Sequence, residues 1–159
     1  MPIAILKAAD TNNKFHSRFS AKKRTYEYKI VNRRAPLAID KKRVWNVFKK
    51  LNLQKMQNES KFFLGKHDFS AFRSIDCQSN SSIKTIDTFA VIEKETHLSI
   101  IISARSFLHS QVRIMVGTLV EIGKGKISKS INDIILSRNR SHAGITAPAH
   151  GLYLIKVDY

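Results

Sequence analysis

The sequence predicts an α+β fold in which a mostly antiparallel sheet carries its helices on one face. Two runs that alternate apolar and polar residues, 83–93 and 97–104, are separated by residues 94–96, a pattern typical of an antiparallel hairpin. A strongly apolar segment with helical periodicity follows at once, and further strand patterns lie near both ends of the chain. No internal repeat or low-complexity linker interrupts the sequence, so residues 1–159 are expected to form a single domain.

Local signals predict the remaining elements. Tyr26, Tyr28 and Ile30 alternate with Glu27 and Lys29, which indicates a half-buried strand. A helix at 53–64 begins after Asn52, a good N-cap, and places Met56 and Phe63 on its inner side. The other expected elements are a short strand at 3–8, a turn at 10–14, a loop at 35–39, a compact turn at 65–72, a polar loop at 76–82, a helix at 130–137, a loop at 141–151 and a last strand at 152–157.

The segment FLHSQVRIMVG, residues 107–117, opens the most apolar helix of the chain. Its apolar side chains recur at helical spacing and leave little of the helix to face water; they are Leu108, Val112, Met115, Val116, Leu119 and Ile122. Gly117 weakens this helix by about 1 kcal/mol relative to alanine, which indicates that something packs closely against that turn.

Arg113 lies inside this apolar helix and cannot lose its charge. Either its stem crosses the edge of the core to reach water, or its guanidinium meets a carboxylate. Glu121, the nearest acid on the same helix, is two turns away, so any direct partner must come from elsewhere. If no partner exists in this chain, the charge is desolvated for little return, and Arg113→Met is expected to be neutral or stabilising.

The charge of the chain indicates a polyanionic partner. Lysine and arginine number 28 against 12 acidic residues, which gives a formal net charge of +16. Solvated faces account for single basic pairs, and an AT-rich genome would raise the lysine content, but six basic clusters with few compensating acids favour nucleic acid first and an anionic membrane surface second. The first of these clusters, Lys22, Lys23 and Arg24, is followed two residues later by Tyr26, and an aromatic ring beside phosphate-binding charge suits an unstacked RNA base.

Several classes of protein are excluded or disfavoured. The apolar runs are far shorter than the roughly 20 residues that a spanning helix needs, and the N-terminus does not resemble a signal peptide. A single cysteine, Cys77, favours a reducing cytoplasm. The six histidines show no metal-ligand spacing, and no phosphate-binding loop, dinucleotide-binding or nucleophile-elbow motif is present, so neither metal nor cofactor is expected.

Four blocks of the sequence together resemble a known family. They are FHSRFSAKKRTYEYKI, GKHDFSAF followed by Cys77, FLHSQVRIMVGTLVEIGKG and ITAPAHGLYLIKVDY. In this order they are similar to the C-terminal half of the tRNA pseudouridine synthase A (TruA) family, over residues 15–159. The resemblance implies a pseudouridine synthase-like half domain.

The resemblance also implies an activity and roles for individual residues. The family isomerises uridine to pseudouridine at positions 38 to 40 of the tRNA anticodon stem-loop, as a homodimer and without metal or cofactor. By this likeness Tyr26 matches the tyrosine that stacks on the target uridine, and Arg113 matches the arginine that pairs with the catalytic aspartate. Lys22, Lys23 and Arg24 are the expected RNA-binding residues.

One departure from the family pattern bears on activity. The family's catalytic aspartate lies in an R-T-D-A-G-V-H motif within a preceding half, and these 159 residues contain no such motif. We therefore expect a shortened synthase that binds tRNA and completes the active site, lacks the N-terminal catalytic half and is inactive alone. The alternatives are a stand-alone RNA-binding module derived from the enzyme, and a basic structural protein associated with the ribosome.

Overall fold

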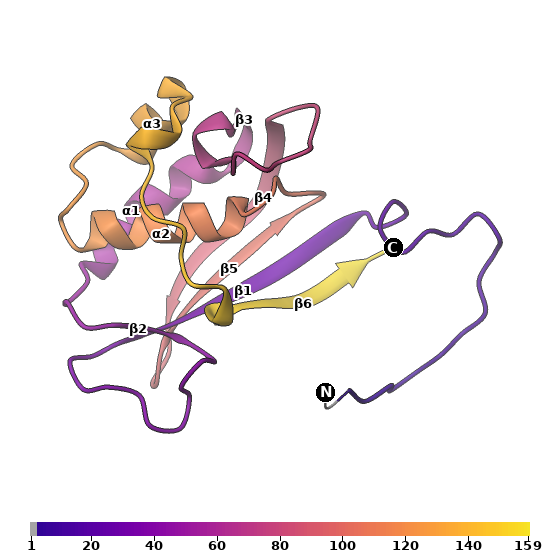
Figure 1. The fold of residues 1–159 in the computed structure, drawn as a ribbon, viewed down its shortest axis with the longest axis horizontal. Coiled ribbons are helices and arrows are strands. Elements are labelled where there is room, and N and C mark those ends of the chain that lie inside the picture. Colours follow the sequence, from indigo (N-terminus) through magenta and orange to yellow (C-terminus); the bar gives the residue numbers. More distant parts are fainter. Residues whose placement is uncertain (1–2) are drawn as a thin grey trace.

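A computed structural model describes residues 3–159 as a six-stranded sheet with three α-helices packed against it (Figure 1). The predicted α+β class with a mostly antiparallel sheet is confirmed. The strands are β1 (Lys23–Asn32), β2 (Trp45–Val47), β3 (Gly65–Asp68), β4 (Ile83–Glu93), β5 (Leu98–Ala104) and β6 (Leu152–Asp158). The helices are α1 (Leu53–Ser60), α2 (Gln111–Gly123) and α3 (Ile131–Ser137).

Strand β1 is the centre of the sheet. Along one side it pairs antiparallel with β5, and β4 and β3 follow in that direction. Along its other side, residues 23–28 pair antiparallel with β6 and residues 30–32 pair parallel with β2, so the two strands share one edge of β1. Chain segments from both ends of the sequence therefore meet at β1.

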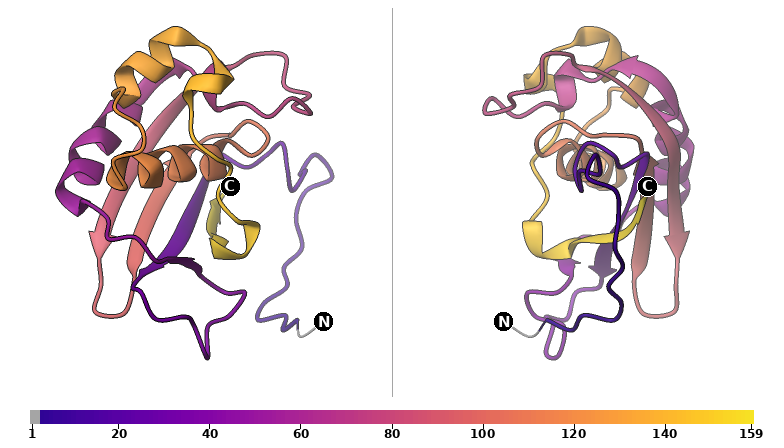
Figure 2. Two further views of the ribbon diagram at one scale, coloured as in Figure 1. Left: turned by 60° about the vertical axis from the view of Figure 1, so that its left-hand side comes forward. Right: turned by 90° about the vertical axis from the view of Figure 1, so that its right-hand side faces the viewer.

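The core lies between the sheet and α2. Tyr28 and Ile30 of β1 and their cross-strand neighbours Ile100 and Leu98 of β5 point into it. Helix α2 crosses this face of the sheet (Figure 2), and every residue in α2 except Arg113 is buried. Because α2 has no polar face, the side of the helix that faces away from the sheet must be buried too. The segment after α3 packs on that side.

Helix α1 forms as its cap signal predicts. The side chain of Asn52 accepts a hydrogen bond from the backbone N–H of Lys55 at 2.9 Å. The helix is shorter than expected, because residues 61–63 continue it as a 3₁₀ turn. Met56 and Phe63 are fully buried, and the Gln57 side chain donates to the backbone carbonyl of Val91 in β4 at 3.2 Å. The helix thus packs against both α2 and β4.

The remaining predicted strands, helix and turn are confirmed in part. The hairpin forms as β4 and β5, the helix expected at 130–137 is α3, and the last strand is β6. Residues 65–68, expected within a turn, instead pair with β4 as strand β3. The predicted strand at 3–8 is wrong: this segment has no strand partner, and Ile3, Ile5 and Leu6 are 77%, 85% and 95% exposed. A short apolar run alone does not make a strand where no neighbour supplies hydrogen bonds.

Strand β1 is not half-buried as predicted, because its second face is partly covered too. Glu27 on that face is buried and accepts a hydrogen bond from Ser99 at 2.6 Å, while Lys94 and Lys29 pair with its carboxylate at 3.3 and 3.6 Å. Burial alone would raise the pKa of Glu27, but the hydrogen bonds from Ser99 and Lys94 and the charge of Lys29 outweigh it and hold the pKa below its ordinary value.

None of the helices within residues 3–159 has the length and apolar character needed to cross a membrane.

Candidate functional site

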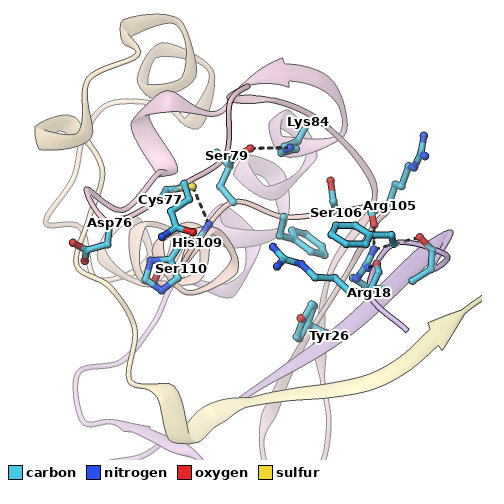
Figure 3. Close-up of a pocket in the computed structure, with 16 residues that line it drawn as sticks. Arg18, Tyr26, Asp76, Cys77, Ser79, Lys84, Arg105, Ser106, His109 and Ser110 are labelled. Carbon is cyan, nitrogen blue, oxygen red and sulfur yellow. Dashed lines mark hydrogen bonds between the residues drawn. The ribbon is translucent and has the colours of Figure 1, made fainter. Parts of the chain in front are cut away.

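A pocket of about 880 Å³ opens where the start of β1 meets two loops (Figure 3). One loop, residues 76–79, precedes β4, and the other, residues 105–110, joins β5 to α2. In Figure 3, Cys77 and His109 stand on one side of the pocket, Arg18 and Arg105 on the other, and Tyr26 lies at its base. The volume lies in the range of pockets that take small ligands.

Tyr26 supplies an aromatic surface to this pocket. It has the same strand parity as Tyr28 and Ile30 and so lies on the helix-bearing face, but beyond the start of α2, where its ring stays partly exposed. Phe107 also lines the pocket and packs edge-to-face on Tyr26, with ring centroids 5.4 Å apart. Phe19 lines the pocket as well, and aromatic rings in a partly open pocket suit a planar ligand such as a base.

Positive charge surrounds the same pocket. The cationic side chains among its lining residues are Arg18, Arg24, Lys84 and Arg105, whereas Asp76 is the single acid among them. Arg24 serves mainly to shape the pocket: its guanidinium donates to the backbone carbonyls of Arg18, Ala21 and Arg105, the last at 2.5 Å. These bonds join the segment before β1 to the loop after β5.

The three residues of the predicted basic cluster have different environments in the structure. Lys22 is exposed, Lys23 forms an ion pair with Asp87 at 3.5 Å, and Arg24 is engaged with backbone carbonyls. Of the three, Arg24 lines the pocket with Tyr26, whereas Lys22 and Lys23 do not. Their binding to RNA stays a prediction, and it rests mainly on Lys22 and Lys23.

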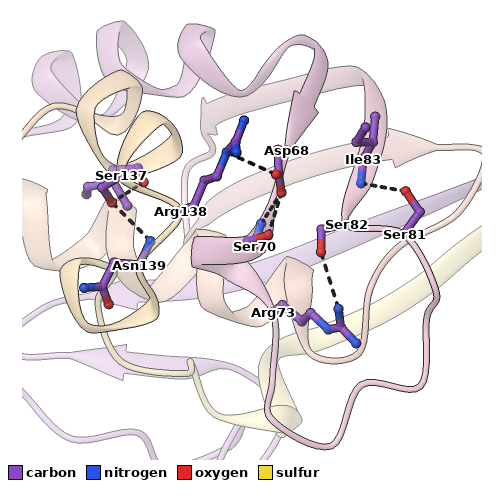
Figure 4. Close-up of polar contacts among 10 residues, drawn as sticks. Asp68, Ser70, Arg73, Ser81, Ser82, Ile83, Ser137, Arg138 and Asn139 are labelled. Carbon is purple, nitrogen blue, oxygen red and sulfur yellow. Dashed lines mark hydrogen bonds and ion pairs between the residues drawn. The ribbon is translucent and has the colours of Figure 1, made fainter.

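The loop wall of the pocket is held by Arg73 (Figure 4). Its guanidinium donates to the carbonyl of Cys77 at 2.6 Å and to the hydroxyl of Ser82 at 3.4 Å, which ties both ends of the loop together. The backbone N–H of His109 lies 3.4 Å from the Cys77 sulfur, so this wall also contacts the loop before α2. The loop is therefore anchored despite its polar sequence.

Arg113 has a partner within the chain, and it is a carbonyl. Its Nε donates to the backbone oxygen of Ala147 at 2.6 Å, while the N–H of Ala147 donates to the carbonyl of Arg113 at 3.1 Å. Within residues 3–159 no carboxylate forms an ion pair with Arg113, and its two terminal nitrogens make no hydrogen bond. The premise that this charge is buried for little return is therefore wrong, because the hydrogen bond to Ala147 compensates it.

Arg113 does not line the pocket of Tyr26; it lies beside Tyr28. Burial raises the pKa of the Tyr28 hydroxyl, and the nearby charge of Arg113 opposes that rise. Tyr26 and Tyr28 lie two residues apart on one face of β1, so Arg113, beside Tyr28, lies on the same side of the sheet as Tyr26. The structure thus places the two predicted residues on the same face of the sheet, but only Tyr26 lines the pocket.

No group of three or more His, Cys, Asp or Glu side chains in residues 3–159 is arranged to hold a metal ion.

Sequence reasoning missed much of the pocket. Phe107, Lys84, Arg105 and Arg18 all line it, and none was singled out for a role. The sequence does carry a signal for Phe107 and Arg105, since both precede the apolar helix directly. Lys84, by contrast, lies at the start of β4, where it pairs with His67 of β3, and only the folded sheet places it in the same pocket as Tyr26.

Comparison with known proteins identifies the family. The family model described as tRNA pseudouridine synthase matches residues 60–159. The chain is 53% identical over 158 residues to tRNA pseudouridine synthase A of Anaplasma phagocytophilum (strain HZ), which covers 99% of this chain and 64% of that protein. It is 52% identical over 160 residues to the same enzyme of Wolbachia pipientis wMel, covering all of this chain and 65% of that protein. The chain thus spans just under two thirds of these relatives, and it belongs to the tRNA pseudouridine synthase family.

Proposed function

We propose that this chain is the tRNA-binding and active-site-completing part of a tRNA pseudouridine synthase, with a uridine of the anticodon stem-loop held in the pocket beside Tyr26. The observation that carries the proposal is the composition of the pocket, in which the three rings of Phe19, Tyr26 and Phe107 and four cationic side chains line a space of about 880 Å³. A flipped nucleotide offers the complementary groups, a flat base and negatively charged phosphates.

The chemistry gives each group a task. Pseudouridine formation detaches uracil from its sugar, rotates it and rejoins it through carbon, and the attacking group of the family is an aspartate. The uridine must leave its helical stack to reach that group, and stacking on Tyr26 offsets part of the lost base stacking. The cations around the pocket hold the flanking phosphates, because phosphate contacts fix the register of the RNA.

In this proposal Arg113 forms an ion pair with the catalytic aspartate. Its Nε is bonded to Ala147, while its terminal nitrogens make no hydrogen bond within residues 3–159, so they stay available for the two oxygens of a carboxylate. An ion pair of this kind keeps the aspartate ionised and aimed. We propose that the aspartate comes from a segment outside these residues, and that the complete enzyme is a homodimer.

Binding of RNA to this chain tests the pocket. Replacing Tyr26 with leucine removes the ring but keeps an apolar side chain, and the affinity for an anticodon stem-loop RNA should fall about 5- to 150-fold, since base–aromatic stacking contributes about 1–3 kcal/mol. The matched control is Tyr153→Leu, a tyrosine on the opposite face of β6 near Lys29. Fluorescence anisotropy measures both, and equal effects of the two substitutions would contradict the pocket.

The dependence of binding on salt tests the cations. If about four to six phosphates are contacted, the log–log slope should be steep, about −0.7 to −0.9 for each contact. Lys84→Gln and Arg105→Gln should each flatten the slope by about one contact, whereas Lys94→Gln at the far end of the β4–β5 hairpin should leave it unchanged. Affinity that does not change with salt would argue against nucleic acid as the ligand.

A second candidate, a non-catalytic RNA-binding module, is favoured by one observation: within residues 3–159 no carboxylate pairs with Arg113. Tritium release from uridine-labelled tRNA separates the two functions. Alone, the chain should release none under either function. Mixed with the part of the Anaplasma relative that this chain does not match, it should release tritium if it completes an active site, and none if it only binds RNA.

A further inference from the structure

The segment from Arg140 to Gly151 packs along α2 and forms the immediate environment of Arg113. We call it the strap. Ala147 in the middle of the strap accepts from Arg113 Nε and donates to the Arg113 carbonyl. Because a guanidinium is planar, fixing Nε limits the directions in which the two terminal nitrogens can point. The position of Ala147 therefore sets the aim of the arginine.

Arg140 anchors the strap on one side of Ala147. Its guanidinium donates to the carbonyl of Gly144 at 2.9 Å, to that of Ala143 at 3.4 Å and to the hydroxyl of Thr146 at 3.4 Å. Burial lowers the pKa of Arg140, which is consistent with a guanidinium taken up by the protein. The loop before Ala147 is thus folded around this side chain.

A hydroxyl of α2 fastens the same loop to the helix. The N–H of Gly144 donates to the Thr118 hydroxyl at 2.8 Å, and that hydroxyl donates in turn to the carbonyl of Ile114 at 2.7 Å. Gly144 leaves no room for a side chain, since a Cβ there would lie 2.7 Å from the Thr118 Cα. The strap therefore touches the backbone of the helix that carries Arg113.

Tyr28 anchors the strap on the other side of Ala147. Its hydroxyl donates to the carbonyl of Pro148 at 2.6 Å, and its side chain is fully buried. Gly151 packs against its ring, where a Cβ would lie 2.7 Å from Cζ. Tyr28 lies two residues from Tyr26 on the same face of β1, so one strand carries both the stacking ring and this anchor.

We infer that Tyr28 and Arg140 are positioning residues that orient Arg113 through the strap and couple its direction to the strand that bears Tyr26. The importance of this orientation rests on the proposed function, in which Arg113 holds a carboxylate. Neither anchor lines the pocket of Tyr26: each holds the strap on one side of Ala147, which is bonded to Arg113. Loss of one anchor allows Ala147 to shift, and this changes the orientation of the Arg113 guanidinium although the side chain is still present.

NMR of the Arg113 Nε–H proton in the isolated chain reports how firmly the strap holds the guanidinium. The resonance is assigned from its disappearance in Arg113→Lys. In Tyr28→Phe the proton should exchange with water about tenfold faster, as expected for the loss of one hydrogen bond. Arg140→Gln should have the same effect and keeps the test decisive should Tyr28→Phe not fold. Circular dichroism confirms that each variant is folded.

Tyr153→Phe is the matched control. It also removes a tyrosine hydroxyl that donates to a backbone carbonyl, that of Arg43 at 2.5 Å, but away from the strap. Its Arg113 proton should exchange as in the unmodified chain. Unchanged exchange in folded Tyr28→Phe and Arg140→Gln, or equal acceleration in Tyr153→Phe, would overturn the inference.

RNA affinity separates this inference from the proposed function. Tyr28→Phe keeps Tyr26 and the cations of the pocket, so its affinity for an anticodon stem-loop RNA should stay within about twofold. Faster proton exchange with preserved affinity supports the positioning role. Unchanged exchange overturns that role whatever the affinity, whereas failure of the unmodified chain to bind RNA overturns the proposed function and leaves the exchange result standing.

Discussion

Gly117→Ala is expected to destabilise the protein although alanine is the better helix former. Gly117 lies in the middle of α2, and a Cβ there would lie 1.8 Å from the carbonyl oxygen of Ile145 and 3.2 Å from the backbone nitrogen of Ala147. The obstacle is backbone and cannot rotate away, so the strap must move off the helix. The sequence predicted a close contact at this turn, and the structure confirms it.

The magnitude follows from the bonds that the shift breaks. Moving Ala147 away loses its N–H bond to the Arg113 carbonyl, about 1 kcal/mol, and the charged bond from Arg113 Nε, about 1.5–3 kcal/mol. Alanine returns about 1 kcal/mol through its helix propensity. The net loss in the free energy of unfolding is therefore about 1.5–3 kcal/mol.

Urea unfolding followed by circular dichroism measures this loss, with Gly123→Ala as the matched control. At Gly123, also in α2, the added Cβ would meet the flexible side chain of Met56, with its sulfur at 2.6 Å, which can shift to make room. That variant should stay within about 1 kcal/mol of the unmodified protein. If Gly117→Ala is as stable as Gly123→Ala, the strap does not pack on α2 as described and the reasoning about Arg113 fails.

Two further predictions concern charged side chains. Arg113→Met should lower the free energy of unfolding by about 1–2 kcal/mol, because it leaves the Ala147 carbonyl without its donor. This is contrary to the neutral or stabilising effect expected from sequence, and equal or higher stability in urea would restore that expectation. At Glu121, burial alone would raise the pKa, but Lys124 at 2.8 Å and Lys126 at 3.4 Å hold it below its ordinary value of 4.5. A lowered pKa in the folded state means that this stabilisation is present above pH 4.5 and is lost as the pH falls through the folded value, so Glu121→Gln should lose less stability on acidification. Thermal unfolding across this pH range measures the loss of stability. The control is Glu95→Gln, which changes an exposed side chain and should behave as the unmodified protein. An acid response of Glu121→Gln identical to that of Glu95→Gln would contradict the prediction.

The fold was predictable where the sequence pattern acts locally. Alternation gave the β4–β5 hairpin, and the Asn52 cap gave the start of α1. Strand β3 was missed because its four residues, GKHD, carry no apolar alternation and become a strand through pairing with β4. At 3–8 the opposite happened, because the apolar run is present but residues 3–159 place no partner strand beside it.

The site was predictable only in part, for the same reason. Tyr26 and its face follow from strand parity, and Tyr26 lines an aromatic and basic pocket, while its stacking on a uridine stays a prediction. The partner of Arg113 was not predictable, because Ala147 lies 34 residues away and offers a backbone carbonyl, which any residue type provides. The roles of Tyr28 and Arg140 depend on the same strap and carry no signal of their own in the sequence.

The central claim is that the pocket beside Tyr26 holds the uridine, and the most direct test is to map where RNA contacts this chain. An anticodon stem-loop RNA carrying 4-thiouridine at the target position, irradiated with near-ultraviolet light, forms crosslinks at contact distance that mass spectrometry of peptides can locate. We predict crosslinks to Tyr26 or Phe107, and their loss in Tyr26→Leu while Tyr153→Leu retains them. Crosslinks confined to the opposite face of the sheet, around Tyr153 and Lys94, would contradict the claim that the pocket beside Tyr26 holds the uridine.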